Sequence, residues 1–310
     1  MNAQVDAALT AAGLDPAGTE AVVRTALAED LRYGPDVTTE ATVPAGAVAT
    51  ADVAARQPGV IAGVPVALAV LDVAGLPVAA AGVTRPDGTA VAAGDIVLSV
   101  TGPLRQLLTA ERTLLNLMTH LSGIATATRA WVSAVAGTGA VIRDTRKTTP
   151  GLRDLEKYAV RCGGGRNHRL GLGDAALIKD NHVAAAGGIA AAIDAVRAAA
   201  PGIALEAECD TLDQVREALA AGCELILLDN MSLAELRVAV ALARRFPGTR
   251  MEASGGLRLD TARAVAQTGV DYLSAGALTH SSPALDLGLD LRAEAPHPEQ
   301  ASRASQLAGQ

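Results

Sequence analysis

Aromatic residues, lysine and cysteine are all scarce in this chain of 310 residues. Its five aromatic side chains are too few for a platform on which nucleic-acid bases stack. The net charge of −7 also disfavours nucleic acid and anionic membrane surfaces as partners, because both attract basic proteins. Half of the residues are hydrophobic, which supplies a packed core and excludes disorder, collagen and a disulfide scaffold.

The cysteines Cys162, Cys209 and Cys223 are odd in number and lack the spacing of a metal-binding motif. No basic residue precedes Arg24, which is not typical of a signal peptide. The apolar run from Val60 to Val83 contains proline, glycine and an aspartate, so it predicts a strand, a short buried helix and a second strand rather than a membrane span. Together these features predict reduced thiols, no membrane segment and a cytoplasmic protein.

Only three basic residues are lysines, against 23 arginines, and Lys147, Lys157 and Lys179 all lie in one window of 33 residues. From Arg143 to Lys179, six arginines and three lysines face four acids, a net charge of +5, so the other 273 residues carry −12. A basic region in an acidic protein is typical of a site for a small polyanion. An ordinary surface loop of mixed charge has the same composition.

The first 103 residues predict an α+β domain with a small sheet. A helix over 17–30 is followed by a turn-rich loop and by short strands at 50–55, 59–62 and 95–100. The spacing of leucines then predicts one long helix from 104 to about 136.

After Gly139 strands and helices alternate, which predicts a parallel sheet with its helices outside. Six strands are too few for an eightfold barrel but suit a smaller or irregular one, and an open doubly wound sheet is the alternative. Helix caps are expected at Ser232 and Asp260. The strands are expected at 140–145, 175–179, 203–209, 223–229, 250–254 and 270–275, and the helices at 189–200, 211–221, 232–245 and 258–268.

Polar, charged or glycine-rich residues follow each of these six strands. The carboxyl ends of the strands of a βα barrel converge on the face where active sites are built, so we expect these residues to share one pocket. Glycine-containing loops after the last strands are typical of a phosphate site. The strand ends are 144–147, 179–182, 208–210, 229–230, 254–256 and 276–278.

Two carboxylates, Glu208 and Asp229, close neighbouring strands. Hard oxygen ligands at such positions suit Mg²⁺, which shares its remaining positions with water and substrate phosphates. Alternatively, each carboxylate pairs with Lys147, Lys179 or an arginine. Glu206 lies on the same strand face two residues earlier, and we expect it to be a buried structural partner rather than a ligand.

The segment from Arg161 to Arg169 joins the first two of these strands and contains three consecutive glycines. Glycine lets the backbone turn tightly and approach a ligand closely. Arg169 is able to grip a carboxylate with two hydrogen bonds. A lone loop histidine is often satisfied within the protein, but beside Arg169 and ahead of Lys179 we expect His168 to contact substrate.

Longer motifs run in order along the chain from about residue 20 to 290. They are Glu29-Asp30-Leu31, Asp36-Val37-Thr38-Thr39, Glu111-Arg112-Thr113-Leu114-Leu115-Asn116, Leu121-Ser122-Gly123-Ile124-Ala125-Thr126, Asp144-Thr145-Arg146-Lys147-Thr148-Thr149-Pro150-Gly151, residues 157–168, residues 177–182, Glu252-Ala253-Ser254-Gly255-Gly256 and Gly269-Val270-Asp271-Tyr272. Through these motifs the chain resembles the quinolinate phosphoribosyltransferases, a family of type II phosphoribosyltransferases.

The resemblance implies an α/β protein with two domains, paired into a homodimer. The first is an α+β open-faced sandwich of residues 1–117, rejoined by residues 286–295. The second is an irregular α/β barrel of six to seven strands, residues 118–285. Residues 291–310 are polar, include Pro296 and Pro298, and are expected to form a flexible tail.

The resemblance also implies a glycosyltransferase of the pentosyltransferase class, nicotinate-nucleotide diphosphorylase (carboxylating), in de novo NAD biosynthesis. With Mg²⁺, it would transfer phosphoribosyl from 5-phosphoribosyl 1-pyrophosphate to the ring nitrogen of quinolinate, giving nicotinate mononucleotide, pyrophosphate and CO₂. The lysines would then act as cations and donors. The alternatives are a paralogue of the same fold acting on a different anion, a Schiff-base lyase with Lys179 as nucleophile, and a non-catalytic anion-binding protein.

Carried over by motif, Arg112 reaches the quinolinate site from the partner subunit, and Glu208 and Asp229 bind Mg²⁺. Lys157 has a place behind the site or on the surface. The catalytic residues implied are Lys147, Lys179, Glu208 and Asp229. Those on the quinolinate side are Arg146, Lys147, His168, Arg169 and Lys179, and Thr145 is a further substrate-binding residue. Those that hold the phosphoribosyl group are Lys147, Lys179, Glu208, Asp229, Ser254, Gly255, Gly256, Gly276, Ala277 and Leu278.

Overall fold

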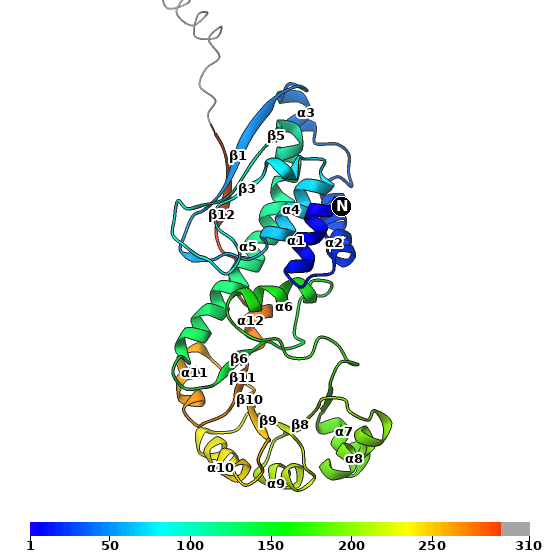
Figure 1. The fold of residues 1–310 in the computed structure, drawn as a ribbon, viewed down its shortest axis with the longest axis vertical. Coiled ribbons are helices and arrows are strands. Elements are labelled where there is room, and N and C mark those ends of the chain that lie inside the picture. Colours follow the sequence, from blue (N-terminus) through cyan, green and yellow to red (C-terminus); the bar gives the residue numbers. More distant parts are fainter. Residues whose placement is uncertain (293–310) are drawn as a thin grey trace, which may run out of the picture. The chain divides into compact units, whose positions relative to one another are not determined.

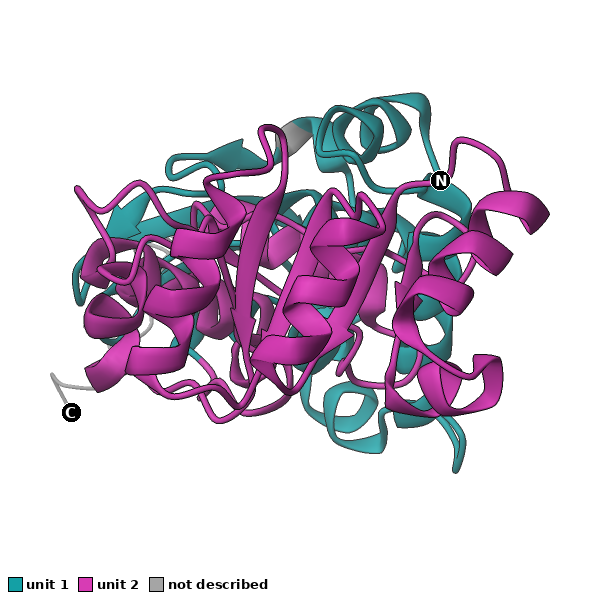
Figure 2. Ribbon diagram, turned by 90° about the horizontal axis from the view of Figure 1, so that it is seen from below, with its two compact units in different colours: residues 1–119, 285–310 teal, residues 120–284 magenta. Residues whose placement is uncertain are grey.

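The computed structural model describes residues 1–292 and divides the chain into two compact units. Unit 1 comprises residues 1–119 and the chain from 285 onward, and unit 2 comprises residues 120–284 (Figure 2). The sequence placed these boundaries at 117/118 and 285/286. The predicted flexible tail, 291–310, lies outside the described residues except for residues 291 and 292.

Unit 1 is built on an antiparallel sheet with the strand order β12-β1-β5-β3. Strand β1 is central, because Ala51 pairs with Val100 of β5 on one side and with Leu291 of β12 on the other. The strands of this unit are β1 (Val48–Ala55), β2 (Gly59–Val60), β3 (Gly82–Val83), β4 (Ala90–Val91), β5 (Ile96–Pro103) and β12 (Leu287–Leu291).

The helices of unit 1 include one that is apolar and buried along most of its length, α4 (Val64–Val73). It lies between β2 and β3, so the predicted order of strand, buried helix and strand over residues 60–83 is confirmed. The other elements are α1 (Ala3–Ala11), α2 (Pro16–Asp30), α3 (Val37–Thr42) and the short 3₁₀ helix η1 (Val78–Ala80).

The long helix α5 (Leu104–Ala134) begins in unit 1 and ends in unit 2. The sequence predicted it over 104–136, and this prediction is confirmed. Its buried residues Leu107, Leu114, Met118 and Leu121 recur at intervals of three, four or seven, the spacing of one helix face.

Unit 2 is a six-stranded parallel sheet in the order β6-β11-β10-β9-β8-β7, with helices between its strands (Figure 1). The strands are β6 (Val141–Arg143), β7 (Ala176–Ile178), β8 (Leu205–Cys209), β9 (Leu225–Asp229), β10 (Arg250–Ser254) and β11 (Tyr272–Ser274). The helices are α6 (Arg153–Cys162), α7 (Asp180–Ala186), α8 (Ile189–Ala199), α9 (Leu212–Ala220), α10 (Leu233–Ala243), α11 (Leu259–Ala266) and α12 (Ala277–His280). All six predicted strands are confirmed, as are the four predicted helices between them.

The strand order identifies an irregular barrel rather than a doubly wound sheet. Strands β7 to β11 follow one another in sequence order, and β6 adjoins β11, whereas a doubly wound sheet reverses direction at a switch point. Beside β6, Arg166 forms a parallel bridge with Arg143 and donates its N–H to the Ile142 carbonyl at 2.9 Å. The segment that carries His168 and Arg169 is thereby fixed next to β6.

Helix caps in unit 2 confirm one prediction and correct another. Ser232 caps α10 by accepting a hydrogen bond from the Glu235 N–H, as predicted. The prediction that Asp260 caps a helix was wrong, because the N-cap of α11 is Arg258 and Asp260 lies in the first turn. There its carboxylate forms an ion pair with the Arg258 guanidinium. A negative charge in the first turn also interacts favourably with the positive end of the helix dipole.

Within residues 1–292, no single helix is long and apolar enough to cross a bilayer. Helices α7 and α8 reach the length and apolar composition of a membrane span only when they are taken together, and the pair is bent by 89°.

Candidate active site

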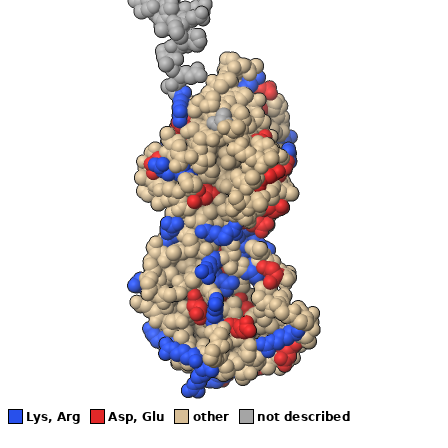
Figure 3. Space-filling model, viewed as in Figure 1, with Lys and Arg blue, Asp and Glu red and all other residues tan. Residues whose placement is uncertain are grey.

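A cavity of about 380 Å³ opens at the carboxyl ends of the barrel strands, and we call it the strand-end cavity. Lys and Arg side chains gather with a few acidic ones on the face of unit 2 seen in Figure 3. Nine of the predicted site residues line the cavity: Thr145, Arg146, Lys147, His168, Arg169, Lys179, Glu208, Asp229 and Ser254. The remaining lining residues are Leu177, Leu227 and Ser274.

Two arginines of this cavity, Arg146 and Arg169, are placed to bind an anion. The Nε atom of Arg146 is buried and has no hydrogen-bond partner among the described residues. Arg169 donates to the Ala175 carbonyl at 3.1 Å, and its pKa is lowered by burial and by the like charge of Arg146. A buried donor without an acceptor and two repelling guanidinium groups are both stabilised when an anion binds between them.

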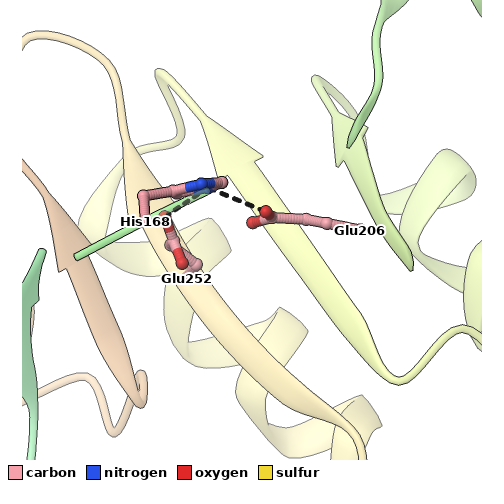
Figure 4. Close-up of side chains that lie close together, drawn as sticks. All are labelled: His168, Glu206 and Glu252. Atoms are coloured by element: carbon pink, nitrogen blue, oxygen red, sulfur yellow. Dashed lines mark ion pairs between the residues drawn. The ribbon is translucent and has the colours of Figure 1, made fainter. Parts of the chain in front are cut away.

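His168 is oriented by hydrogen bonds at both ring nitrogens. The backbone N–H of Arg169 donates to its Nδ1 at 2.7 Å, and its Nε2 lies 2.8 Å from Oε2 of Glu206 (Figure 4). Because Nδ1 accepts, the ring proton of the neutral imidazole lies on Nε2 and is donated to Glu206. His168 thus lines the cavity while its polar atoms bind groups of the protein.

Glu206 is buried, as predicted, and Glu252 of β10 lies beside it. His168, Glu206 and Glu252 are near enough together to hold a metal ion, but a protonated Nε2 has no lone pair to offer one. Glu252 also accepts hydrogen bonds from Arg143 and Ser274. Burial, followed by the charge of Glu206, raises the pKa of the Glu252 carboxyl.

The acidic pair of the cavity is divided between two kinds of partner. Glu208 forms an ion pair with Lys179 at 2.5 Å, which was one of the alternatives for this carboxylate. Asp229 instead accepts a hydrogen bond from the side-chain amide of Asn230 at 2.6 Å. Because β8 and β9 are adjacent and parallel, both carboxylates reach the same cavity.

The predicted glycine loops lie next to these side chains. Gly255 has φ +82°, and a Cβ on it would lie 2.4 Å from Asn230 Oδ1 and 2.7 Å from Asp229 Oδ1. Gly256 follows with φ +57°. Glycine at 255 therefore lets the backbone pass directly beside the Asp229 carboxylate.

The segment 276–280 contacts the backbone and stem of Lys147. Thr279 Oγ1 donates to the Lys147 carbonyl at 2.7 Å, and a Cβ on Gly276 would lie 3.1 Å from Lys147 Cδ. Leu278 is buried, and its N–H donates to the Ala275 carbonyl at 3.3 Å, whereas Ala277 is exposed. His280 was not predicted, yet its Nε2 would lie 3.2 Å from the same Cβ, and its only sequence signal is its place two residues beyond a predicted phosphate loop.

Arg112 does not line the strand-end cavity. It lies on α5 within unit 1, where its side chain is 72% exposed and 3.5 Å from Glu111.

Comparison with known proteins gives the same family at both ends of the chain. Residues 36–122 match the N-terminal domain of quinolinate phosphoribosyl transferase, and residues 124–290 match its C-terminal domain. The chain is 59% identical over 271 residues to the nicotinate-nucleotide pyrophosphorylase (carboxylating) of Mycobacterium leprae (strain TN), covering 87% of this chain and 95% of that relative. It is 39% identical over 285 residues to the Homo sapiens protein of that name, covering 91% and 94%.

Among solved structures, the nicotinate-nucleotide pyrophosphorylase from Francisella tularensis superposes with a TM-score of 0.84 at 37% identity. The match covers 89% of this chain and 96% of the other. Both domains, in order and nearly complete, are thus shared with these relatives. The chain belongs to the quinolinate phosphoribosyltransferase family.

Proposed function

We propose that the strand-end cavity is where this chain carries out the reaction of its family. The chain is a pentosyltransferase of de novo NAD biosynthesis, a nicotinate-nucleotide pyrophosphorylase (carboxylating). Its substrates are quinolinate and 5-phosphoribosyl 1-pyrophosphate, and its products are nicotinate mononucleotide, pyrophosphate and CO₂. The observation that carries the assignment to this cavity is the buried, unpartnered Nε of Arg146 beside the guanidinium of Arg169.

Quinolinate carries two carboxylates on neighbouring ring atoms, and Arg146 and Arg169 are the groups that bind them. A guanidinium binds a carboxylate in a planar fork, which fixes the ring as well as its charge. His168 contributes a wall of the cavity and holds the Arg169 backbone through Nδ1. Lys147 and Thr145 border the same space.

The phosphoribosyl group and the pyrophosphate lie on the other side of the cavity, toward Lys147, Lys179, Glu208 and Asp229. The loops 254–256 and 276–278 are where the phosphates would bind, because Gly255 and Gly276 let a ligand approach the backbone closely. Two carboxylates at adjacent strand ends are a donor set that fits Mg²⁺, and Glu208 and Asp229 would hold it. When bound, Mg²⁺ would neutralise charge on the departing pyrophosphate.

The reaction breaks the bond from ribose C1 to the pyrophosphate oxygen, which leaves with the electron pair, while the pyridine nitrogen forms the new bond to C1. The bond from ring C2 to its carboxylate then breaks, and the electron pair stays on C2 beside the cationic nitrogen until a proton replaces CO₂. Lys147 and Lys179 act as cations and donors in this scheme. The ion pair of Lys179 with Glu208 supports a role as cation and donor rather than as the nucleophile of a Schiff-base lyase.

A homodimer in which Arg112 serves the partner's site is part of the proposal. The exposed guanidinium of Arg112 beside a single carboxylate supports this role. We also propose that the protein acts in the cytoplasm, since its three cysteines are all free thiols.

The test is an assay of CO₂ and nicotinate mononucleotide formation from quinolinate, 5-phosphoribosyl 1-pyrophosphate and Mg²⁺. Each of Arg146→Ala and Arg169→Ala removes charge-assisted hydrogen bonds of about 1.5–3 kcal/mol, so the KM for quinolinate rises by about 10- to 100-fold. Arg216→Ala, on the exposed face of α9, is the matched control and leaves the KM unchanged. Wild-type KM values in both site variants would contradict the proposed roles. Turnover of another pyridine acid without CO₂ would favour the paralogue.

A further inference from the structure

Lys157 is the largest side chain in the described chain that is fully buried. It lies on α6, and its ammonium donates to Oδ1 of Asp144 and to the carbonyl oxygen of His168 at 3.0 Å. Burial lowers the pKa of this ammonium, and the nearby Asp144 carboxylate opposes that shift. The lysine is therefore neither on the surface nor in the strand-end cavity.

Asp144 is equally buried and collects hydrogen bonds from three directions. Its Oδ1 accepts from Lys157 and from the backbone N–H of His168 at 2.9 Å, and its Oδ2 accepts from the Asn167 amide. The Asn167 amide also donates to the Lys157 carbonyl at 2.8 Å. We call Asp144, Lys157 and Asn167 the buried brace.

The buried brace joins the two chain segments that carry the quinolinate-binding arginines. Asp144 stands two residues before Arg146 at the end of β6. The N–H of His168 binds Asp144 and its carbonyl binds Lys157, so the residue directly before Arg169 is held at both backbone polar groups. The backbone before Arg169 is therefore tied to the backbone before Arg146 by hydrogen bonds of buried side chains that do not line the strand-end cavity.

A buried ion pair is a poor device for stability alone, because its desolvation offsets the attraction and an apolar pair is often as stable. Charged groups contribute geometric specificity instead, because the hydrogen bonds of a carboxylate and an ammonium fix the positions of the backbone groups that they bind. We propose that Lys157 and Asp144 are positioning residues that set the spacing between Arg146 and Arg169, and so make the cavity select a neighbouring dicarboxylate over a monocarboxylate. The inference rests on the proposed roles of those two arginines.

The test measures inhibition of the quinolinate reaction by phthalate, a benzene 1,2-dicarboxylate without the reacting nitrogen, and by benzoate, its monocarboxylate counterpart. In Lys157→Met the ratio of the benzoate to the phthalate inhibition constant falls about tenfold, and the KM for 5-phosphoribosyl 1-pyrophosphate stays within about twofold. Asn167→Ala, at a half-buried position, lowers the ratio in the same direction but less. Asp154→Asn, an exposed acid on the same helix, is the matched control and keeps the wild-type ratio.

Unfolding temperature is recorded for every variant. A folded Lys157→Met with a lower unfolding temperature and a wild-type ratio would show a merely structural role and overturn the inference. If Lys157→Met does not fold, Asn167→Ala decides, and an unchanged ratio in it is equally fatal. Arg146→Ala and Arg169→Ala distinguish a failure of the proposed function from a failure of this inference. If neither variant weakens inhibition by phthalate, the proposed roles of the arginines fail. If both weaken it while the brace variants keep the wild-type ratio, only this inference fails.

Discussion

The glycines between α6 and the next strand make close contact with helix α5. We predict that Gly163→Ala destabilises unit 2. A Cβ at residue 163 would lie 2.5 Å from the Ala125 carbonyl oxygen and 2.5 Å from Thr128 Cβ, both on α5. Ordinary contact begins at 3.4 Å, so either the helix or the loop has to move by roughly 0.9 Å. Neither contact involves the far end of a flexible side chain, so relief requires a backbone shift.

The expected cost is that of overpacking a core, about 1–3 kcal/mol. For a unit of about 165 residues this lowers the unfolding temperature by about 2–12 °C. Gly163 has φ −73°, which alanine adopts without strain, so the loss arises from the clash alone. Thermal unfolding followed by circular dichroism measures it.

Gly173→Ala is the matched control, because a Cβ there has nothing within 4 Å and its φ is not in the left-handed region. It is expected to change the free energy of unfolding by no more than about 0.5 kcal/mol. The same unfolding temperature for Gly163→Ala and Gly173→Ala would refute the reasoning. A shifted loop also moves the buried brace, so Gly163→Ala should weaken phthalate inhibition as well.

Three further outcomes are expected. The folded-state pKa of Glu252 is raised above 4.5, so the contribution of Glu252 to stability is full below about pH 4.5 and is lost as the pH rises through the raised value. The unfolding temperature of the wild type should therefore fall more steeply over that pH range than that of Glu252→Gln. Equal slopes in the two proteins would contradict this. Burial raises the pKa of the Cys209 thiol to about 12, so iodoacetamide at neutral pH should label it only after denaturation, as mass spectrometry of the native protein will show. Mixing Arg112→Ala with Lys179→Ala subunits should restore roughly a quarter of wild-type activity if sites are shared across a twofold dimer, and inactive verified heterodimers would count against sharing.

Elements with a simple apolar period were predictable from the sequence, whereas helix α6, which buries two charged side chains, was not. The barrel strands and the helices α8 to α11 present one apolar face, which the pattern of residues revealed. Helix α6 escaped prediction because Glu156 and Lys157, both fully buried, interrupt its apolar face. Their partners, among them Asp144 and His120, lie in other segments of the chain. Only in the folded protein do these partners offset the cost of burying the two charges.

The candidate site shows a similar limit. Residues such as Lys179 and Asp229 were predictable because parallel strands end at one face. The direction of a side chain was not. His168 was expected to contact substrate and lines the cavity, but the sequence did not reveal that its ring nitrogens bind Glu206, a carboxylate from another strand, and the Arg169 backbone. The three glycines of 163–165 were expected to let the backbone turn tightly and approach a ligand, and the close approach made by Gly163 and Gly165 is to α5.

The pairing of β12 with β1 has a consequence for synthesis on the ribosome. Strand β1 has β5 as its early partner, but its other edge is covered by residues that follow about 180 positions after β5 ends. At roughly 5–20 residues per second, translation leaves that edge exposed for about 10–40 s, during which the whole barrel is made. Asp52, on β1, then gains Arg292 as its partner. An unpaired strand edge invites pairing with another chain, so during this interval the free edge of β1 is a place where the nascent protein is open to aggregation.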